Sequence, residues 1–276
     1  MNHSTDRRRI LLTAAALAAA SMLPARRANA VIPAEIKAKG KLVVGIQGDN
    51  PPWGFVDTGG KQEGFDADIS GLFAKELGVS VEFVPLAVAN RIPALTTGRV
   101  DVLFATMAML PDRAKAVQFS KPYVANITYV VAAKTSPIKG YADLAKHTVG
   151  VPRSSSMDTD ITKNAPADIT IRRFDDDAAT IQALLSGQVD AVGANMFYVA
   201  RLDQSKPGTY ENKFPLTTLY NGACTRLGEK EINAAINAFI DKIKANGELA
   251  AAYQKWMKTA PPEFPTSVKD IPFTAD

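Results

Sequence analysis

The chain has 276 residues, 46% of them apolar and 22% charged, values typical of a globular protein with a full core and room for one large domain or two ordinary ones. Its net charge of +4 arises in residues 1–30. Without the five arginines and one aspartate found there, 27 basic and 27 acidic residues balance each other. A neutral body, two histidines and one cysteine give no basis for nucleic-acid binding, a zinc site or a Cys/His nucleophile. We therefore expect no nucleic-acid partner, no metal and no cofactor.

The first thirty residues have the layout of a secretory signal peptide. Three arginines, Arg7-Arg8-Arg9, precede an uncharged stretch over 10–23 that is too short to span a bilayer core of about 30 Å. Ala28-Asn29-Ala30 follows as a small-x-small cleavage pattern. The sequence predicts export, with cleavage near Ala30, and leaves open whether the leader is of the twin-arginine or the Sec type. The mature protein is expected in the periplasm.

Buried strands and amphipathic helices alternate through the first half of the mature chain. Apolar runs predict strands, and apolar positions three and four residues apart predict helices that end at glycines. In chain order, the expected elements are a strand over 41–46, a loop over 48–52, a helix over 65–77, a strand over 79–84, a helix over 92–97 and a strand over 100–105. This alternation favours a mostly parallel sheet flanked by helices.

The same pattern then begins again. The second set comprises strands over 148–151, 169–174 and 189–194, a helix over 177–185, helices over 229–257 interrupted at Asn246-Gly247, and an extended tail from Pro261. The segment from Leu95 to Asp101 is echoed by Leu185 to Asp190: each places a glycine and then Val-Asp after a helix. Two similar α/β lobes follow from this repeat, with a ligand expected at the carboxyl ends of their strands. Cys224, between small and β-prone residues, is expected as a buried core thiol.

Several motifs, in order, resemble one family of periplasmic proteins. They are Gly64-Phe65-Asp66-Ala67-Asp68, Ile92-Pro93-Ala94-Leu95, Gly98-Arg99-Val100-Asp101, Pro111-Asp112-Arg113, Phe119-Ser120-Lys121-Pro122-Tyr123, Val149-Gly150-Val151, Val189-Asp190-Ala191 and Lys255-Trp256. Each motif is weak alone, but together they cover roughly residues 40–258. The chain resembles the family 3 periplasmic solute-binding proteins that serve amino-acid-type ABC importers.

The resemblance implies the type II periplasmic binding protein fold, which is α/β with two lobes, each a mostly parallel sheet flanked by helices. Lobe 1 would be 31–124 plus 220–276, and lobe 2 would be 125–219, with crossing segments near 124–127 and 219–223. The family closes by hinge motion over a small ligand and hands it to a membrane permease. We accordingly expect a monomeric, non-enzymatic protein that binds a small carboxylate.

The family's binding residues map onto ten positions here. They are Arg113, Arg91, Thr106, Ala108, Ser154, Ser155, Ser156, Asn195, Asn50 and Trp53. Arg113 matches the arginine that clamps the ligand's α-carboxylate, a task suited to a planar, bidentate cation. The three serines match an anion-binding loop at a helix N-terminus. Arg91 and the Ala105-Thr106 pair resemble members that bind acidic amino acids.

Four positions depart from the family pattern. Asn50 and Val88 stand where aromatic walls are usual, and Ala108 replaces a threonine. Asn195 replaces the aspartate that neutralises the ligand's ammonium group, which leaves open whether the ligand is an amino acid or a non-amino dicarboxylate. Trp53, Phe55 and Tyr123 could supply apolar walls instead, although each also suits the core.

Two other classes compete with this interpretation. An enzyme resembling the cyclohexadienyl dehydratases would need a general acid in the cleft, for which Asp49 and Asp112 are the nearest candidates. A sensor input domain is the second alternative, but no membrane helix or signalling domain follows it in the chain.

Overall fold

The computed structural model describes residues 34–275. The predicted signal peptide over 1–30, with its cleavage point near Ala30, lies outside the described residues. Within 34–275, no helix has both the length and the apolar character required to cross a bilayer.

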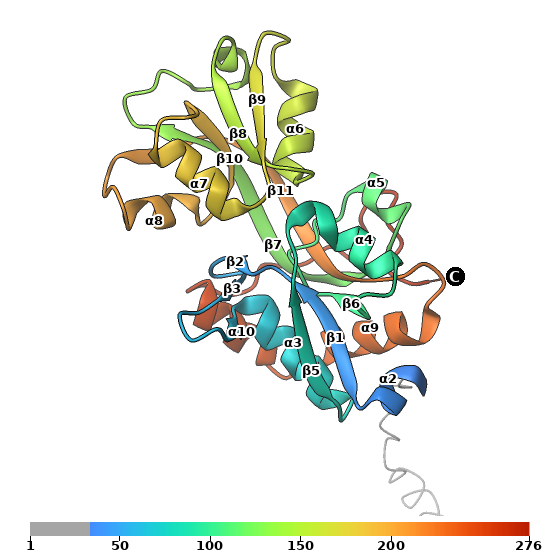
Figure 1. The fold of residues 1–276 in the computed structure, drawn as a ribbon. Coiled ribbons are helices and arrows are strands. Elements are labelled where there is room, and N and C mark those ends of the chain that lie inside the picture. The colour runs from blue at the N-terminus through green and yellow to red at the C-terminus, as the bar shows by residue number, and fades with distance from the viewer. Residues whose placement is uncertain (1–33, 276) are drawn as a thin grey trace, which may run out of the picture. The chain divides into compact units, whose positions relative to one another are not determined.

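One eight-stranded sheet, in the order β5-β1-β6-β11-β7-β10-β8-β9, forms the centre of the fold (Figure 1). Its strands are β1 (Lys41–Ile46), β5 (Ser80–Pro85), β6 (Val102–Leu103), β7 (Gln118–Ala133), β8 (Thr148–Pro152), β9 (Thr170–Phe174), β10 (Ala191–Asn195) and β11 (Tyr210–Thr225). Strand β1 pairs in parallel with β5 and β6, and β8 pairs in parallel with β9 and β10. The long strands β7 and β11 pair antiparallel with each other and join these two parallel groups.

Helices flank both parallel groups, which confirms the predicted α/β class. The helices are α2 (Ala34–Lys39), α3 (Phe65–Glu76), α4 (Arg91–Thr96), α5 (Pro111–Ala114), α6 (Ser156–Asn164), α7 (Asp177–Leu185), α8 (Tyr198–Asp203), α9 (Lys230–Ala245) and α10 (Glu248–Trp256), with 3-10 turns η1 (Val88–Asn90) and η2 (Tyr141–Leu144). We use lobe 1 for the elements around β1, β5 and β6, and lobe 2 for those around β8, β9 and β10. The division at residues 124 and 220 stays a prediction.

The structure corrects the sequence prediction in three places. The strand expected over 100–105 is only Val102–Leu103, because the chain turns away from the sheet at Ala105 and Thr106. The loop expected over 48–52 contains β2 (Asp49–Asn50), which pairs with β3 (Gly54–Val56) and then β4 (Gln62–Glu63) in a small separate sheet. The two sixteen-residue strands β7 and β11 were not predicted, because their polar residues interrupt the apolar pattern.

The motif residues of α3 hold lobe 1 together around two aspartates. Asp66 is buried and accepts hydrogen bonds from the Tyr123 hydroxyl at 2.6 Å and the Thr106 N–H at 2.8 Å. Asp68 accepts from both Lys255 Nζ and Trp256 Nε1 at 2.7 Å, which fixes the end of α10. The two motifs Gly64 to Asp68 and Lys255-Trp256, far apart in the sequence, are therefore in direct contact in the fold.

The echoed segments serve the same purpose in both lobes. The Asp101 carboxylate accepts from the Val43 N–H at 2.9 Å, and the Asp190 carboxylate accepts from the Thr148 N–H at 2.7 Å. Gly98 and Gly187, with φ of 76° and 72°, end the preceding helices in the left-handed conformation that favours glycine. Each lobe thus ties its first strand to the strand that follows its helix.

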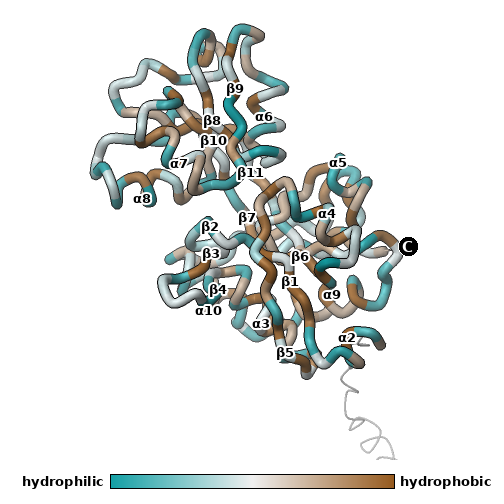
Figure 2. Tube along the Cα trace, viewed as in Figure 1, coloured by the Kyte–Doolittle hydropathy of each residue, from teal (hydrophilic) through white to brown (hydrophobic). Residues whose placement is uncertain are grey.

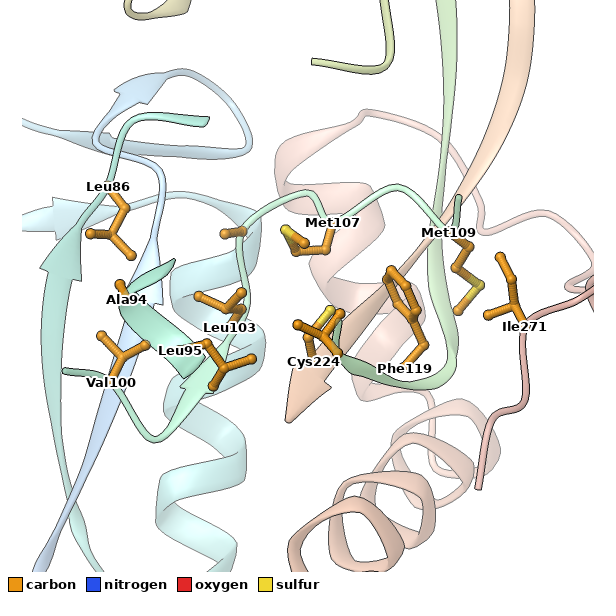
Figure 3. Packing of buried hydrophobic residues seen from close by; sticks show 12 residues of the cluster. Leu86, Ala94, Leu95, Val100, Leu103, Met107, Met109, Phe119, Cys224 and Ile271 are labelled. Carbon is orange, nitrogen blue, oxygen red and sulfur yellow. The ribbon is translucent and has the colours of Figure 1, made fainter. Parts of the chain in front are cut away.

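Apolar residues concentrate along inner strands of the sheet such as β1, whereas the edge strand β9 is mostly hydrophilic (Figure 2). In lobe 1, residues from α4, β6, β7 and β11 pack around Leu95, Leu103 and Phe119, and Ile271 from the C-terminal tail completes the cluster (Figure 3). Cys224 is fully buried in this cluster, which confirms its prediction as a core thiol, and burial raises the pKa of its thiol.

Candidate ligand-binding site

A cavity of about 40 Å³ lies where the strand ends of the two lobes meet. Its lining residues are Gln47, Asn50, Trp53, Val88, Arg91, Thr106, Arg113, Asn126, Pro152, Ser155, Ser156, Met157, Asp177 and Asn195. Eight of the ten predicted binding residues are among them. The side chains of Ala108 and Ser154 are not, although the carbonyl oxygens of both contact Arg113.

Arg91 is a buried cation on the lobe 1 side of the cavity, with only 3% of its surface exposed. Its Nη1 donates to the Ala105 carbonyl at 2.7 Å, whereas its Nε and Nη2 have no partner in the described part of the chain. Burial lowers the pKa of Arg91, and the charges of Asp177, Asp49 and Asp66 oppose that shift. A buried guanidinium with two unpartnered N–H groups is costly unless an anion binds it.

Arg113 of α5 is half-buried and lines the same cavity as Arg91. Its Nη1 donates to the Ala108 carbonyl at 3.3 Å and its Nη2 to the Ser154 carbonyl of lobe 2 at 3.0 Å. Burial, together with the charge of Arg91, lowers its pKa to about 10, so it remains a cation at neutral pH. Within 34–275, neither Arg91 nor Arg113 has a carboxylate within 4.0 Å, in contrast to Arg173 and Arg226.

Thr106 enters the cavity from a strained backbone. Its φ of 47° is unfavourable for a β-branched residue. The Asp66 carboxylate holds this conformation through the Thr106 N–H, while the Thr106 hydroxyl donates to the Gln47 side-chain oxygen. Burial raises the pKa of Asp66 to about 6, against the hydrogen bonds from Tyr123 and Thr106 and the charge of Arg91. The strain therefore positions a cavity-lining residue.

The three consecutive serines of lobe 2 have three different environments. Ser154 contacts Arg113 through its backbone carbonyl. Ser155 is the N-cap of α6, with its hydroxyl accepting from the Asp158 N–H at 3.1 Å. Ser156 lines the cavity, and the only contact of its hydroxyl among the described residues is to the Met157 sulfur at 3.3 Å.

Asn50 and Asn195 meet each other across the lobes. Asn195 Nδ2 donates to Asn50 Oδ1 at 3.1 Å, and Asn195 Oδ1 accepts from the Phe197 N–H at 2.9 Å. Arg201 of α8 donates to Asn50 Oδ1 and to the Asp49 carbonyl, both at 3.0 Å. The two asparagines thus have their polar atoms satisfied by protein contacts.

Asp49 adds a second contact between the lobes. Its Oδ2 accepts from the N–H groups of Asp177 at 2.8 Å and Ala178 at 3.1 Å, in the first turn of α7. Burial and the nearby Asp177 charge raise the pKa of Asp49 to about 6. We call the group Asp49, Asn50, Asn195, Arg201 and the first turn of α7 the interlobe latch.

Sequence reasoning missed three polar residues that line the cavity, Asn126, Gln47 and Asp177, of which the last two are bonded to each other. Gln47 follows β1 and donates through Nε2 to Asp177 Oδ2 at 2.9 Å. Asp177, three residues after β9, is 3% exposed and its Oδ1 accepts from the Tyr198 hydroxyl at 2.5 Å. Both follow the carboxyl ends of parallel strands, a signal that was available from the sequence.

The apolar side of the cavity is formed mainly by Trp53, Val88 and Met157. Trp53 packs edge-on against Phe197 of lobe 2 with ring centroids 5.5 Å apart, and its Nε1 has no partner among the described residues. The other candidates for apolar walls, Phe55 and Tyr123, lie outside the cavity lining.

The two acids considered for an enzyme are not free in the cavity. Asp112 is exposed and pairs with Lys115 at 2.6 Å, and Asp49 belongs to the interlobe latch. In the part of the chain that the structure describes, no three His, Cys, Asp or Glu residues are grouped so as to hold a metal ion.

The chain is similar to known solute-binding proteins over most of its length. A profile of the family described as bacterial extracellular solute-binding proteins, family 3, matches residues 42–259. The ABC transporter glutamine-binding protein GlnH of Bacillus subtilis (strain 168) is 31% identical over 236 residues, covering 83% of this chain and 86% of that protein.

Two solved structures share both the fold and part of the sequence. The P235GK mutant of ArgBP from T. maritima is 29% identical with a TM-score of 0.76, covering 82% of this chain and 99% of the other. The ancestral amino acid-binding protein AncCDT-1, a precursor of cyclohexadienyl dehydratase, is 31% identical with a TM-score of 0.74, covering 81% and 98%.

Proposed function

This chain belongs to the family 3 bacterial extracellular solute-binding proteins, and from that premise we propose that it binds a small carboxylate of the amino-acid type in the cavity between its lobes. The carboxylate would be an acidic amino acid or a related dicarboxylate. The observation that carries the proposal is the pair of arginines that line one cavity and, within 34–275, have no carboxylate partner, one of them with two unpartnered N–H groups.

In this proposal, each polar group has a defined part. Arg113 clamps one carboxylate of the ligand and Arg91 a second, since a guanidinium binds a carboxylate bidentately. Ser155 and Ser156 approach the anion from lobe 2, at the N-terminus of α6. Trp53 covers the apolar part of the ligand. The lobes close over the ligand by hinge motion in the strands β7 and β11 that join them.

The partner of the loaded protein would be the membrane permease of an ABC importer. Similarity to GlnH, which is named as a binding protein of such a transporter, supports this role. We propose that the mature protein acts as a monomer in the periplasm after removal of its leader. The role is non-enzymatic: the relatives are named for binding, and AncCDT-1 is itself described as an amino acid-binding protein.

A thermal-shift screen tests the proposal. The mature protein is heated with each of the twenty amino acids, with linear dicarboxylates and with aromatic acids. A true ligand at a hundred times its Kd adds about 2.7 kcal/mol to the free energy of unfolding. For a chain of this size, that raises Tm by roughly 5–10 °C. Stabilisation by neutral or basic amino acids, with no response to any di-acid, would contradict the role assigned to Arg91.

A further inference from the structure

Beyond its two arginines, the cavity has an acidic residue that the proposed carboxylate binding does not use. Among the described lining residues, Asp177 is the only carboxylate. It lies in lobe 2 at the start of α7, whereas Arg91 lies in lobe 1. The Asp177 charge opposes the lowering of the Arg91 pKa by burial, yet the two side chains are not within ion-pair distance. The cavity therefore has a cationic wall and an anionic wall that face each other.

Asp177 has the capacity to bind a further cation. A carboxylate can accept about four hydrogen bonds. Two are already made, from the Tyr198 hydroxyl to Oδ1 and from Gln47 Nε2 to Oδ2. Both donors are neutral, so the negative charge itself is not compensated by them. They also fix the carboxylate in one orientation, which reduces the entropy lost when a ligand binds.

The other polar groups are less suited to a cationic ligand group. Asn195 already uses both of its side-chain atoms within the interlobe latch. Asn126 has an unpartnered Oδ1, but an amide oxygen is neutral and cannot offset a buried positive charge. Asp49 accepts two N–H groups of α7 and is not among the lining residues.

We infer that Asp177 is the counter-charge for an ammonium group on the ligand, so that the cavity selects a zwitterionic amino acid over a dicarboxylate that lacks an amine. The inference rests on the proposed function, since it assumes that the ligand's carboxylates lie on Arg91 and Arg113. It places the ammonium group on the lobe 2 side and the carboxylates on the lobe 1 side.

Calorimetry with matched ligand pairs tests this assignment. L-glutamate is compared with glutarate, and L-aspartate with succinate, because each pair differs in the amine alone. The wild-type protein should bind the amine-bearing member at least tenfold more tightly. Asp177→Asn should weaken its binding by about 10- to 100-fold and leave the affinity for the des-amino member unchanged or higher, as expected for one charge-assisted hydrogen bond.

Asp176→Asn is the matched control, because it removes the same charge one residue away. Asp176 does not line the cavity, and asparagine remains a good N-cap for α7. This variant should retain the wild-type preference. If Asp177→Asn does not fold, Asp177→Glu keeps the charge and should keep a preference for the amine.

The outcomes separate this inference from the proposed function. Equal loss of both members of a pair in Asp177→Asn, or no loss of either, overturns the inference and leaves carboxylate binding in place. A wild-type protein that prefers the des-amino acid does the same. A wild-type protein that binds no carboxylate in the panel overturns the proposed function itself.

Discussion

Two polar regions adjoin each other where the lobes meet. One is the part of the cavity lined by Arg91 and Arg113, which we call the arginine wall, and the other is the interlobe latch. In the latch, Asn50, Asn195 and Arg201 satisfy one another with hydrogen bonds of 3.0–3.1 Å. At the arginine wall, Arg91 has two unpartnered N–H groups, and Trp53 Nε1 and Asn126 Oδ1 are likewise unpartnered in the described part of the chain. Since buried polar groups are normally paired, the unpaired set indicates the surface that a ligand completes.

The comparison separates two ways of stabilising the closed form. Latch contacts are made by the protein alone and act on the balance between open and closed conformations. At the arginine wall, Arg113 makes one such contact, to the Ser154 carbonyl of lobe 2, whereas the unpartnered N–H groups of Arg91 contribute only when a ligand is bound. Mutations in the two regions should therefore differ in how much they change the ligand-free protein.

The largest effect is expected from Arg113→Ala. Removing this guanidinium leaves a desolvated ligand carboxylate unpaired, which should weaken binding by about 2–5 kcal/mol. The ligand-free protein should melt within a few degrees of wild type. Calorimetry with the ligand from the screen measures the loss. Arg153→Ala is the control, because Arg153 is exposed beside the serines and lies outside the cavity lining. If both variants bind like wild type, the carboxylate clamp lies elsewhere.

Arg201→Ala should have a smaller effect of a different kind. It removes two charge-assisted bonds, to the Asp49 carbonyl and to Asn50 Oδ1, and Arg201 itself does not line the cavity. The closed form loses about 1.5–2 kcal/mol, so affinity should fall about 10- to 30-fold. Small-angle scattering should show a larger radius of gyration for the ligand-free variant.

The exposed Arg172, also in lobe 2, provides the matched control for this variant. It donates to the Gln188 carbonyl within its own lobe, so Arg172→Ala should change neither quantity. A loss of affinity in Arg201→Ala with an unchanged scattering curve would place Arg201 in the ligand site. The distinction between the arginine wall and the interlobe latch would then be wrong.

Acid pH should strengthen the latch. Burial and Asp177 raise the pKa of Asp49 from 3.8 to about 6 when the lobes are in contact. Asp177 belongs to α7 of lobe 2, and the first turn of α7 contacts the Asp49 carboxylate, so we expect both causes to weaken when the lobes part. The closed form then binds a proton more tightly than the open form, and closure gains stability as pH falls through 6.

Ligand affinity should rise by at most about tenfold between pH 7 and pH 5, the limit set by a shift from 3.8 to about 6. Calorimetry at both pH values measures this change. Asp49→Asn should flatten the profile, because its amide does not titrate. An affinity that falls toward pH 5 in wild type would show that the closed form does not take up this proton.

The sequence predicted the fold well where local patterns carry it. The echo of Leu95 to Asp101 in Leu185 to Asp190 correctly indicated two similar units, because Asp101 and Asp190 each bond the first strand of their lobe. The strands β7 and β11 escaped prediction because their stability comes from pairing with each other over long sequence distances, not from apolar periodicity.

The site was predicted in part for a related reason. Matched motifs placed eight residues in the cavity, but Asn50 and Asn195 contact each other, which no local pattern shows. Asp177 was missed because its neighbours Asp175 and Asp176 make it look like one member of a solvated acidic run. Only the tertiary structure distinguishes it as the buried member of the three.

The smallest expected effects separate the three adjacent serines. Ser156→Ala should reduce ligand affinity about 2- to 5-fold with unchanged stability, since it removes one cavity hydroxyl with no strong internal partner. Ser155→Ala should lower the free energy of unfolding by about 1 kcal/mol through loss of the α6 N-cap. Ser154→Ala should leave affinity unchanged, because Ser154 contacts Arg113 through its backbone carbonyl alone. Calorimetry and thermal melts on the three variants measure both quantities. If Ser154→Ala lost the most affinity, Ser154 and not Ser156 would present its side chain to the ligand. In lobe 2, the distinction between groups that bind the ligand and groups already bonded within the protein would then be wrong.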